Sequence, residues 1–452
     1  MLRLCAAGFI IAAAAMAADV TAPSSVTFNK DVLPILQRNC QSCHRPGQVA
    51  PMSFLTYKDA RPWAKAIKTA VAVRKMPPWS ADPKYGHFTN DRALKQSEID
   101  TLVAWADRGA PEGDAKDAPA PKQWPSGGWE VQPDIIIDGP EIDVPAAGVI
   151  DWFWVAIPGA TFTKDTWITS IQYQILDPGV VHHTGIAFIP HTADVKYNEP
   201  IWQRVDRDAD LITIPGQKRS PDAVLLTAIG GGHQDTYVPG HTIADYRPYN
   251  AARMIPANTD VFLNLHYTPN GTPVRTHVRV GFTVAKEPPK RQVLMILASG
   301  PTDREHFRIP ANDGDWAAVP ADGAFTQDVE IFSLMPHMHV RGKAMTFTLT
   351  YPDGKVETIL NVPRYDFNWQ LEYDTSVKVP KGTKLHIDAH FDNSVNNKYN
   401  PNPTRDVFYG EQTWEEMMTG YVGVLVDDPN IDPRKLHLFE DSRASRFQAA
   451  ER

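Results

Sequence analysis

Cysteine is scarce in this chain of 452 residues, and its distribution excludes several kinds of site. The three cysteines are Cys5, Cys40 and Cys43, so no residue after position 43 carries a thiol. The long remainder of the chain therefore forms no internal disulfide. It also forms no blue-copper site, because such a site needs a cysteine thiolate beside two histidines.

Basic charge and long apolar runs are lacking as well. Lysine and arginine number 45 against 53 aspartate and glutamate residues, for a net charge of −8, so we expect no nucleic-acid partner. After the N-terminus, no apolar run approaches the ~20 residues of a membrane-spanning helix. The G-x-S-x-G, P-loop and H-E-x-x-H patterns are also missing, which removes sequence support for a serine hydrolase, a nucleoside triphosphatase or a zincin.

The first 18 residues have the pattern of a secretory signal peptide. Arg3 supplies the positive start, residues 6–16 are apolar, and residues 15–17 form a small-x-small cleavage site. We expect this segment, with Cys5, to be removed, and the mature protein to be exported to the periplasm or secreted. No membrane span is expected after cleavage.

Residues 40–44 read Cys-Gln-Ser-Cys-His, the C-x-x-C-H pattern of covalent attachment of a c-type haem. In that chemistry the thiols of Cys40 and Cys43 add to the haem vinyl groups, and His44 ligates the iron. A thioredoxin-like C-x-x-C pair is the alternative, but it does not need the histidine. The pattern therefore predicts one covalently bound haem.

Residues 26–112 around this motif resemble a small class I cytochrome c domain. Short helices are expected over residues 31–39 and 97–105, the second with Ser97 as its N-cap and an end at Gly109. The resemblance implies an all-α fold and a thioether as the second axial ligand. Met76 is our choice, and the alternatives are Met52 and His87. Ligation by methionine and histidine suits electron transfer.

Residues 113–128 are rich in proline, glycine and alanine and read as a linker. From residue 129 the pattern changes to short alternating runs punctuated by turn residues, which predicts antiparallel sandwiches. About 300 residues is large for one sandwich, so we expect two, over 129–286 and 287–428. Residues 429–452 are expected to form a charged C-terminal extension.

Thirteen of the 15 histidines lie beyond residue 128, in three notable groups. His337 and His339 form a His-x-His pair, which on a strand places both imidazoles on one face. His182 and His183 are adjacent, so they reach one metal only if a bulge or a strand end redirects one of them. His266 ends an apolar run. Imidazole binds copper and zinc alike, so these residues alone leave the metal open.

The order His-His, His-Tyr, His-x-His and Glu-Met resembles the ascorbate-dependent type II copper monooxygenases, over residues 130–428. The resemblance implies two jelly-roll-like sandwiches with one copper ion each. His182, His183 and His266 would hold the first ion. His337, His339 and Met417 would hold the second, with Tyr421 beside it, and Met418 is an alternative to Met417.

The chain also departs from that family. It lacks the disulfides of the animal enzymes, and Met335 stands where peptide-amidating members carry a carboxylate-binding arginine, so a peptide substrate is not expected. His233, His241, His386 and His390 are additional, and His390 reads as a structural histidine rather than a ligand. Aromatic residues that can line the cleft, or more simply pack the core, are Tyr237, Tyr246, Tyr365, Phe367 and Trp369.

The complete expectation is a small all-α cytochrome c-like domain followed by two all-β jelly-roll-like sandwich domains. The expected activity is hydroxylation of a C–H bond of a small organic substrate with O₂. The expected cofactors are two copper ions and one haem, and the donor would be an ascorbate-like reductant or a redox protein. Two alternatives remain, a haem and copper electron-transfer protein without oxygenase activity and a zinc-dependent hydrolase or carbohydrate-binding module. A thioether such as Met417 is a poor zinc ligand, which disfavours the second.

Overall fold

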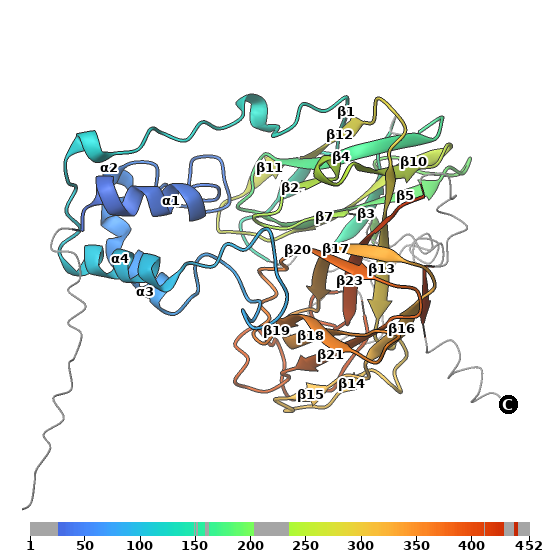
Figure 1. The fold of residues 1–452 in the computed structure, drawn as a ribbon. Helices are drawn as coiled ribbons and strands as arrows, with labels where there is room; N and C mark the ends of the chain where they lie inside the picture. Colours follow the sequence, from blue (N-terminus) through green and yellow to red (C-terminus); the bar gives the residue numbers. More distant parts are fainter. Residues whose placement is uncertain are drawn as a thin grey trace, which may run out of the picture.

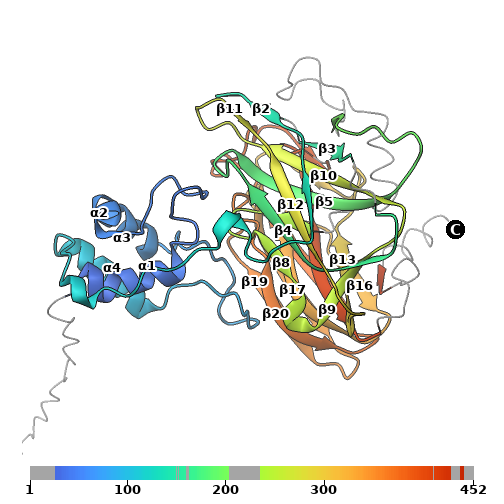
Figure 2. The same ribbon diagram turned by 90° about the horizontal axis from the view of Figure 1, so that it is seen from above.

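The computed structural model describes residues 26–148, 150, 152–158, 162–202, 235–410, 412–428 and 438–441. Within these ranges the chain is mostly β-sheet, with a group of short helices at one side (Figures 1 and 2). The predicted signal peptide over residues 1–18 lies outside the described residues. No helix among the described residues is both long enough and apolar enough to cross a membrane.

The first sandwich packs part of a nine-stranded sheet against a five-stranded sheet. The nine-stranded sheet contributes β1 (Ile135–Asp138), β12 (Val278–Val284), β4 (Thr166–Ile175), β8 (Ile243–Asp245) and β9 (Ala251–Ile255). The five-stranded sheet has the order β6 (Ile201–Trp202), β3 (Phe153–Ala156), β10 (Thr259–Tyr267), β5 (Val181–Pro190) and β7 (Asp235–Tyr237). A small ribbon adds β2 (Ile142–Val144) and β11 (Val274–Thr276).

The second sandwich packs the rest of the nine-stranded sheet against a six-stranded sheet. The first of these contributes β13 (Arg291–Ser299), β23 (Thr419–Val426), β17 (Val329–His337) and β20 (Tyr373–Val379). The six-stranded sheet contains β19 (Val356–Val362), β18 (Gly342–Thr350), β21 (Lys384–Phe391), β16 (Ala321–Phe325), β24 (Phe439–Asp441) and β15 (Trp316–Ala317). A further pair is β14 (Arg308–Ile309) with β22 (Val407–Phe408).

The two sandwiches share one sheet rather than standing apart. The predicted boundary at residues 286 and 287 falls in the loop between β12 and β13. However, β9 and β13 pair in parallel, with Arg291 opposite Ala251 and Gln292 opposite Ala252. A buried cluster that includes Tyr246 and Phe332 fills the seam. The predicted C-terminal extension also contributes one strand, because β24 pairs with β16.

The helical elements of the described residues are all short. In chain order they are η1 (Phe28–Val32), α1 (Leu33–Asn39), α2 (Tyr57–Ala60), η2 (Arg61–Trp63), α3 (Ala64–Ala72), α4 (Gln96–Asp107), η3 (Ala115–Asp117), η4 (Ser126–Gly128) and η5 (Arg247–Tyr249). Both expected helices are present, but Lys95 rather than Ser97 is the N-cap of α4, where Glu98 accepts a hydrogen bond from the Lys95 N–H at 2.9 Å. The predicted linker lies along this helical segment, since Gln37 donates to the Ala120 carbonyl at 3.0 Å.

The prediction of a distinct all-α cytochrome c-like domain is wrong. The structure is dominated by strands, and the α-helices have only 4 to 12 residues. The physical reason is the packing of residues 79–92, which we call the junction loop. This loop lies between α3 and α4 and packs on the β-sheets. The aromatic rings of Trp79 and Phe88 lie 4.8 and 5.3 Å from that of Tyr373 on β20. The helical segment thus belongs to a largely β molecule, while the predicted sandwiches agree with the observed sheets.

Candidate metal centres

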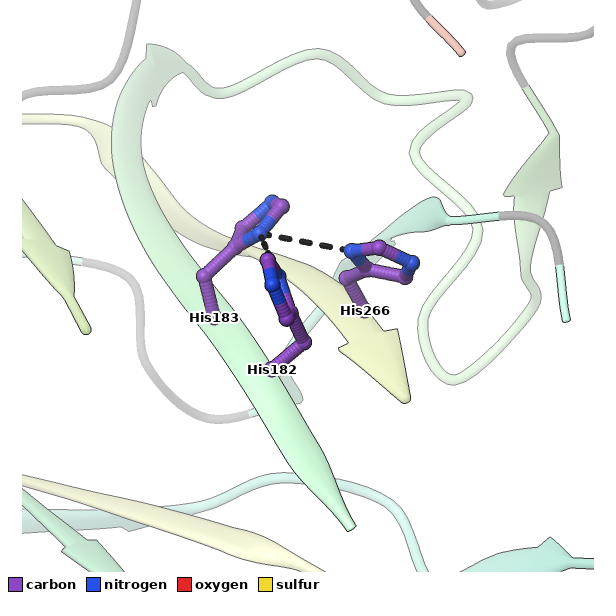
Figure 3. Close-up of side chains that lie close together, drawn as sticks. All are labelled: His182, His183 and His266. Carbon is purple, nitrogen blue, oxygen red and sulfur yellow. Dashed lines mark hydrogen bonds between the residues drawn. The ribbon is translucent and has the colours of Figure 1, made fainter. Parts of the chain in front are cut away.

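His182, His183 and His266 converge through a bulge between two strands. β5 and β10 are antiparallel, with His266 opposite His183 and Tyr267 opposite Val181. His182 is therefore the extra residue of β5, and the bulge turns it to the side of its neighbour. The Nδ1 atom of His183 lies 3.2 Å from that of His182 and 3.3 Å from that of His266 (Figure 3). We call these three residues the three-histidine site.

Burial keeps the imidazoles of His182 and His266 neutral. It lowers the pKa of His182 to about 4; Asp366 opposes this shift and His337 adds to it. It lowers the pKa of His266 well below the usual value, and His182 and His339 add repulsion. Neutral imidazoles offer nitrogen lone pairs to a metal. The three ligand atoms lie within 4.8 Å of one another, so this donor set fits a single copper or zinc ion.

A second group of donors lies in the other sandwich. His337 ends β17, His339 follows two residues later, and Met417 precedes β23. The Nε2 atom of His337 is 3.1 Å from the Met417 sulfur, and the two imidazole centroids are 5.4 Å apart. All three side chains are buried. We call them the histidine–methionine site; the soft thioether favours copper over zinc.

Hydrogen bonds orient both histidines of the histidine–methionine site. The Nδ1 of His337 lies 2.5 Å from the Gln370 Oε1, and the Nδ1 of His339 lies 3.2 Å from the Glu415 carbonyl oxygen. Since these partners are acceptors, each Nδ1 carries the proton and each Nε2 is free to ligate. Burial lowers the pKa values of His337 and His339 to about 4 and about 3. No pattern in the sequence indicates that Gln370 orients His337.

A buried ion pair holds the backbone of the same site. The Glu416 carboxylate accepts the N–H groups of His339 at 2.9 Å and Arg341 at 2.6 Å. The Arg341 guanidinium lies 3.9 Å from it, and both side chains are almost fully buried. Burial raises the pKa of Glu416, while Arg341 and the backbone N–H groups oppose that rise. This pair fixes the His-x-His turn against the segment that presents Met417.

Met418, the alternative to Met417, and the candidate Tyr421 occupy different places in the second sandwich. Met418 belongs to the core of the second sandwich and lies against Gly300. Tyr421 lies on β23, and its ring centroid is 6.0 Å from that of His337. Tyr421 and Met335 border a cavity of about 80 Å³ whose other walls include Asp235, Glu372 and Asp374. This small cavity adjoins Tyr421, and its walls carry both carboxyl and apolar side chains.

Aromatic side chains lie between the two sites. The ring centroid of Trp152 is 5.4 Å from that of His183 and 6.5 Å from that of His339. Phe367 stacks on His182 at 4.7 Å and lies 6.2 Å from His339. Each aromatic ring therefore contacts one imidazole from each sandwich, so an apolar layer separates the donor sets. Phe367 was a sequence candidate for the cleft, whereas Trp152 carried no signal beyond being aromatic.

The C-x-x-C-H motif follows α1 and opens toward the first sandwich. Burial raises the pKa of Cys40 to about 12, whereas Cys43 lines a cavity of about 670 Å³. Phe54 stacks on His44 at 4.2 Å, and burial lowers the pKa of His44, opposed by the backbone of Met52. Neither Cys40 nor His44 lines this cavity, so the covalent attachment of a haem stays a prediction. Met76 is partly exposed in the loop after α3, and its ligation stays a prediction.

Several other histidines pair with carboxylates. His390 lies 3.1 Å from Asp315. The remaining pairs are His191 with Asp260, His241 with Glu372, His277 with Asp138, His306 with Asp303, and His386 with Asp322 and Asp388. His233 lies outside the described residues.

No protein-family profile and no curated protein matches this chain. Among solved structures, it is similar to a structure of the infectious bursal disease virus Gx strain at 8% identity, over 68% of this chain and 77% of that chain, with a TM-score of 0.17. It is also similar to the VP2 subviral particle of infectious bursal disease virus at 10% identity, over 65% and 71% of the two chains, with a TM-score of 0.18. TM-scores this low carry no argument about fold or function.

Proposed function

We propose that this protein is an exported copper-dependent monooxygenase that hydroxylates a C–H bond of a small organic substrate with O₂. The observation that carries the proposal is the pairing of two different donor sets in one molecule. One consists of three imidazoles, and the other of two imidazoles and a thioether. The resemblance of the ligand order to the copper monooxygenases agrees with this pairing.

The two sites suit different duties. Copper bound there would supply one-electron redox chemistry and the activation of O₂. The thioether of Met417 would favour Cu(I), the state of copper that reacts with O₂. The hydrogen bonds of Gln370 and Glu416 orient the donors, and the donor side chains are buried from solvent. Tyr421 and the adjoining small cavity offer the space for a substrate group beside the histidine–methionine site.

A second candidate is an electron-transfer protein that binds haem and copper without oxygenase activity. The aromatic layer of Trp152 and Phe367 favours it, because these rings occupy space between the sites. The two candidates differ in one measurable property, the consumption of O₂ coupled to an organic product.

Metal content and O₂ uptake test the proposal on the purified mature protein. We expect about two coppers and one haem per chain, and reoxidation of the reduced copper by O₂. His183→Ala should remove one copper and Met417→Ile should weaken the other, while His390→Ala, which alters a histidine paired with Asp315, should keep both. Zinc in place of copper, or no tightly bound metal, would overturn the assignment. Bound copper without product from a broad substrate screen would favour the electron-transfer candidate.

A further inference from the structure

The predicted linker is fastened to the first sandwich at its C-terminal end (Figure 1). The side-chain amide of Gln172 on β4 donates to the Gly128 carbonyl at 3.1 Å, and that of Gln174 donates to the Gly127 carbonyl at 2.6 Å. Residues 122–125, which come shortly before these glycines, line the same cavity as the two glutamines. The linker therefore forms a wall against β4.

This wall encloses the cavity of about 670 Å³ beside Cys43, which we call the linker cavity. Its other walls come from the residues that follow the C-x-x-C-H motif and from the first sandwich. They include the cationic Arg45 and the apolar side chains of Val49, Ile175 and Leu176. Sites for small organic molecules have volumes of roughly 300–1,000 Å³, so the linker cavity has the size of such a site.

Two cationic side chains share the Trp124 ring in the linker cavity. The Arg45 guanidinium carbon lies 4.1 Å from the ring centroid, and the Lys122 Nζ lies 4.7 Å from it. The Nε of Arg45 is buried without a hydrogen-bond partner, and neither cation forms an ion pair with a carboxylate of the described residues. The indole ring attracts both cations, but their charges repel each other. An anion bound beside them would remove this repulsion.

The charge of the cavity lining selects the kind of anion. Glu130 is the one carboxylate among the described lining residues, and it accepts a hydrogen bond from the Thr242 hydroxyl at 3.3 Å. Burial lowers the pKa of Arg45, opposed by Cys43 and Glu130, so the guanidinium is partly removed from water without a paired anion. Two cations against one carboxylate leave one positive charge, which matches an anion with a single negative charge.

We propose that the linker cavity is a binding site for a small organic carboxylate with an apolar body. The carboxylate would accept charge-assisted hydrogen bonds from Arg45 and Lys122. The apolar body would lie against the aliphatic part of the wall, which is formed by Val49, Ile175 and Leu176. No donor of either candidate metal centre lines this cavity, so the proposal does not depend on bound copper.

Titration calorimetry on the full mature protein tests the site with 3-phenylpropionate, octanoate and the neutral 3-phenylpropanamide. We expect saturable binding of one molecule of either carboxylate per chain, and binding of the amide weaker by about tenfold. Arg45→Gln should weaken carboxylate binding by about tenfold as well, whereas Arg45→Lys, which keeps the charge, should retain most of it. Lys122→Gln alters an exposed side chain and should weaken binding by about threefold.

Lys116→Gln is the matched control, because Lys116 belongs to the same linker, pairs with Asp114 at 2.9 Å and does not line the cavity. This variant should keep the original affinity. Equal weakening in Lys116→Gln and Lys122→Gln would assign the effect to the overall charge of the chain and overturn the site. Equal affinity for the carboxylate and its amide, or no saturable binding of either carboxylate, would also overturn it. The copper monooxygenase proposal is judged separately, by metal content and O₂ uptake.

Discussion

At the scale of single residues, the orientation of each imidazole depends on contacts beyond its own position in the chain. Adjacent His182 and His183 could share a metal only at a bulge, and β5 contains that bulge. Gln370, however, is 33 residues from His337 and lies in an irregular stretch. No spacing rule connects an acceptor in a loop to a histidine on a strand, so such contacts need the folded structure.

Loss of the Gln370 acceptor should weaken copper binding at one site only. In Gln370→Leu the Nδ1–H of His337 loses its partner, and the imidazole is no longer held with Nε2 toward Met417. We expect the copper affinity of the histidine–methionine site to fall about 10- to 100-fold. Competition with a Cu(I) chelator measures it. Gln370→Glu, which keeps an acceptor oxygen, should retain most of the affinity, and equal loss at both sites would contradict the assignment.

The buried carboxyl of Asp235 should give stability a defined dependence on pH. Burial raises its pKa from 3.8 to about 6. As the pH rises through this interval, the unfolded chain loses its proton first, so the free energy of unfolding falls. Asp235→Asn lacks this loss, and we expect it to gain up to about 3 kcal/mol relative to the original protein between pH 4 and pH 7. Denaturant unfolding at several pH values measures the difference, and a pH-independent difference would refute it.

At the scale of elements, the buried pair of Glu416 and Arg341 joins the turn after β17 to the start of β23. Glu416→Gln replaces one acceptor oxygen with an N–H₂ group that faces a backbone N–H, and it leaves the Arg341 guanidinium without its counter-charge. We expect a loss of about 3 kcal/mol in the free energy of unfolding, the lower end for breaking a buried pair. Urea titration measures it.

Glu357→Gln is the comparison for this prediction. Glu357 forms a partly exposed ion pair with Lys355 at 2.7 Å, and exposed pairs contribute about 0–1 kcal/mol. Similar losses in the two variants would show that the buried pair does not hold the site.

Strand and helix positions were predictable where the local pattern was strong. β21 alternates buried residues with half-buried or exposed ones along its length, and the helix expected over residues 97–105 lies within α4. The prediction of a separate all-α domain was wrong because a local sequence pattern does not show which element an irregular segment packs against. Trp79 and Phe88 carry no helical or strand period, yet they pack on Tyr373 of β20 and tie the helical segment to the sheets.

At the scale of the whole molecule, the junction loop should control the attachment of the helical segment. Asn90→Ala removes both hydrogen bonds to the backbone of residues 372 and 374, and we expect docking to weaken by about 1–3 kcal/mol. Limited proteolysis should then cut residues 113–128 faster. Lys84→Ala, at an exposed position of the same loop, should not change the cleavage rate. Unchanged cleavage in Asn90→Ala would mean that other contacts carry the docking.

The shared nine-stranded sheet has a consequence for any attempt to divide the protein. A gene split between codons 286 and 287 would leave β9 and β13 with unpaired edges and would expose Tyr246 and Phe332 from the seam. Unpaired edges and exposed aromatic rings promote aggregation. The halves would therefore be poor separate reagents, and co-expressed fragments that reassociate would be the practical way to label or exchange one sandwich at a time.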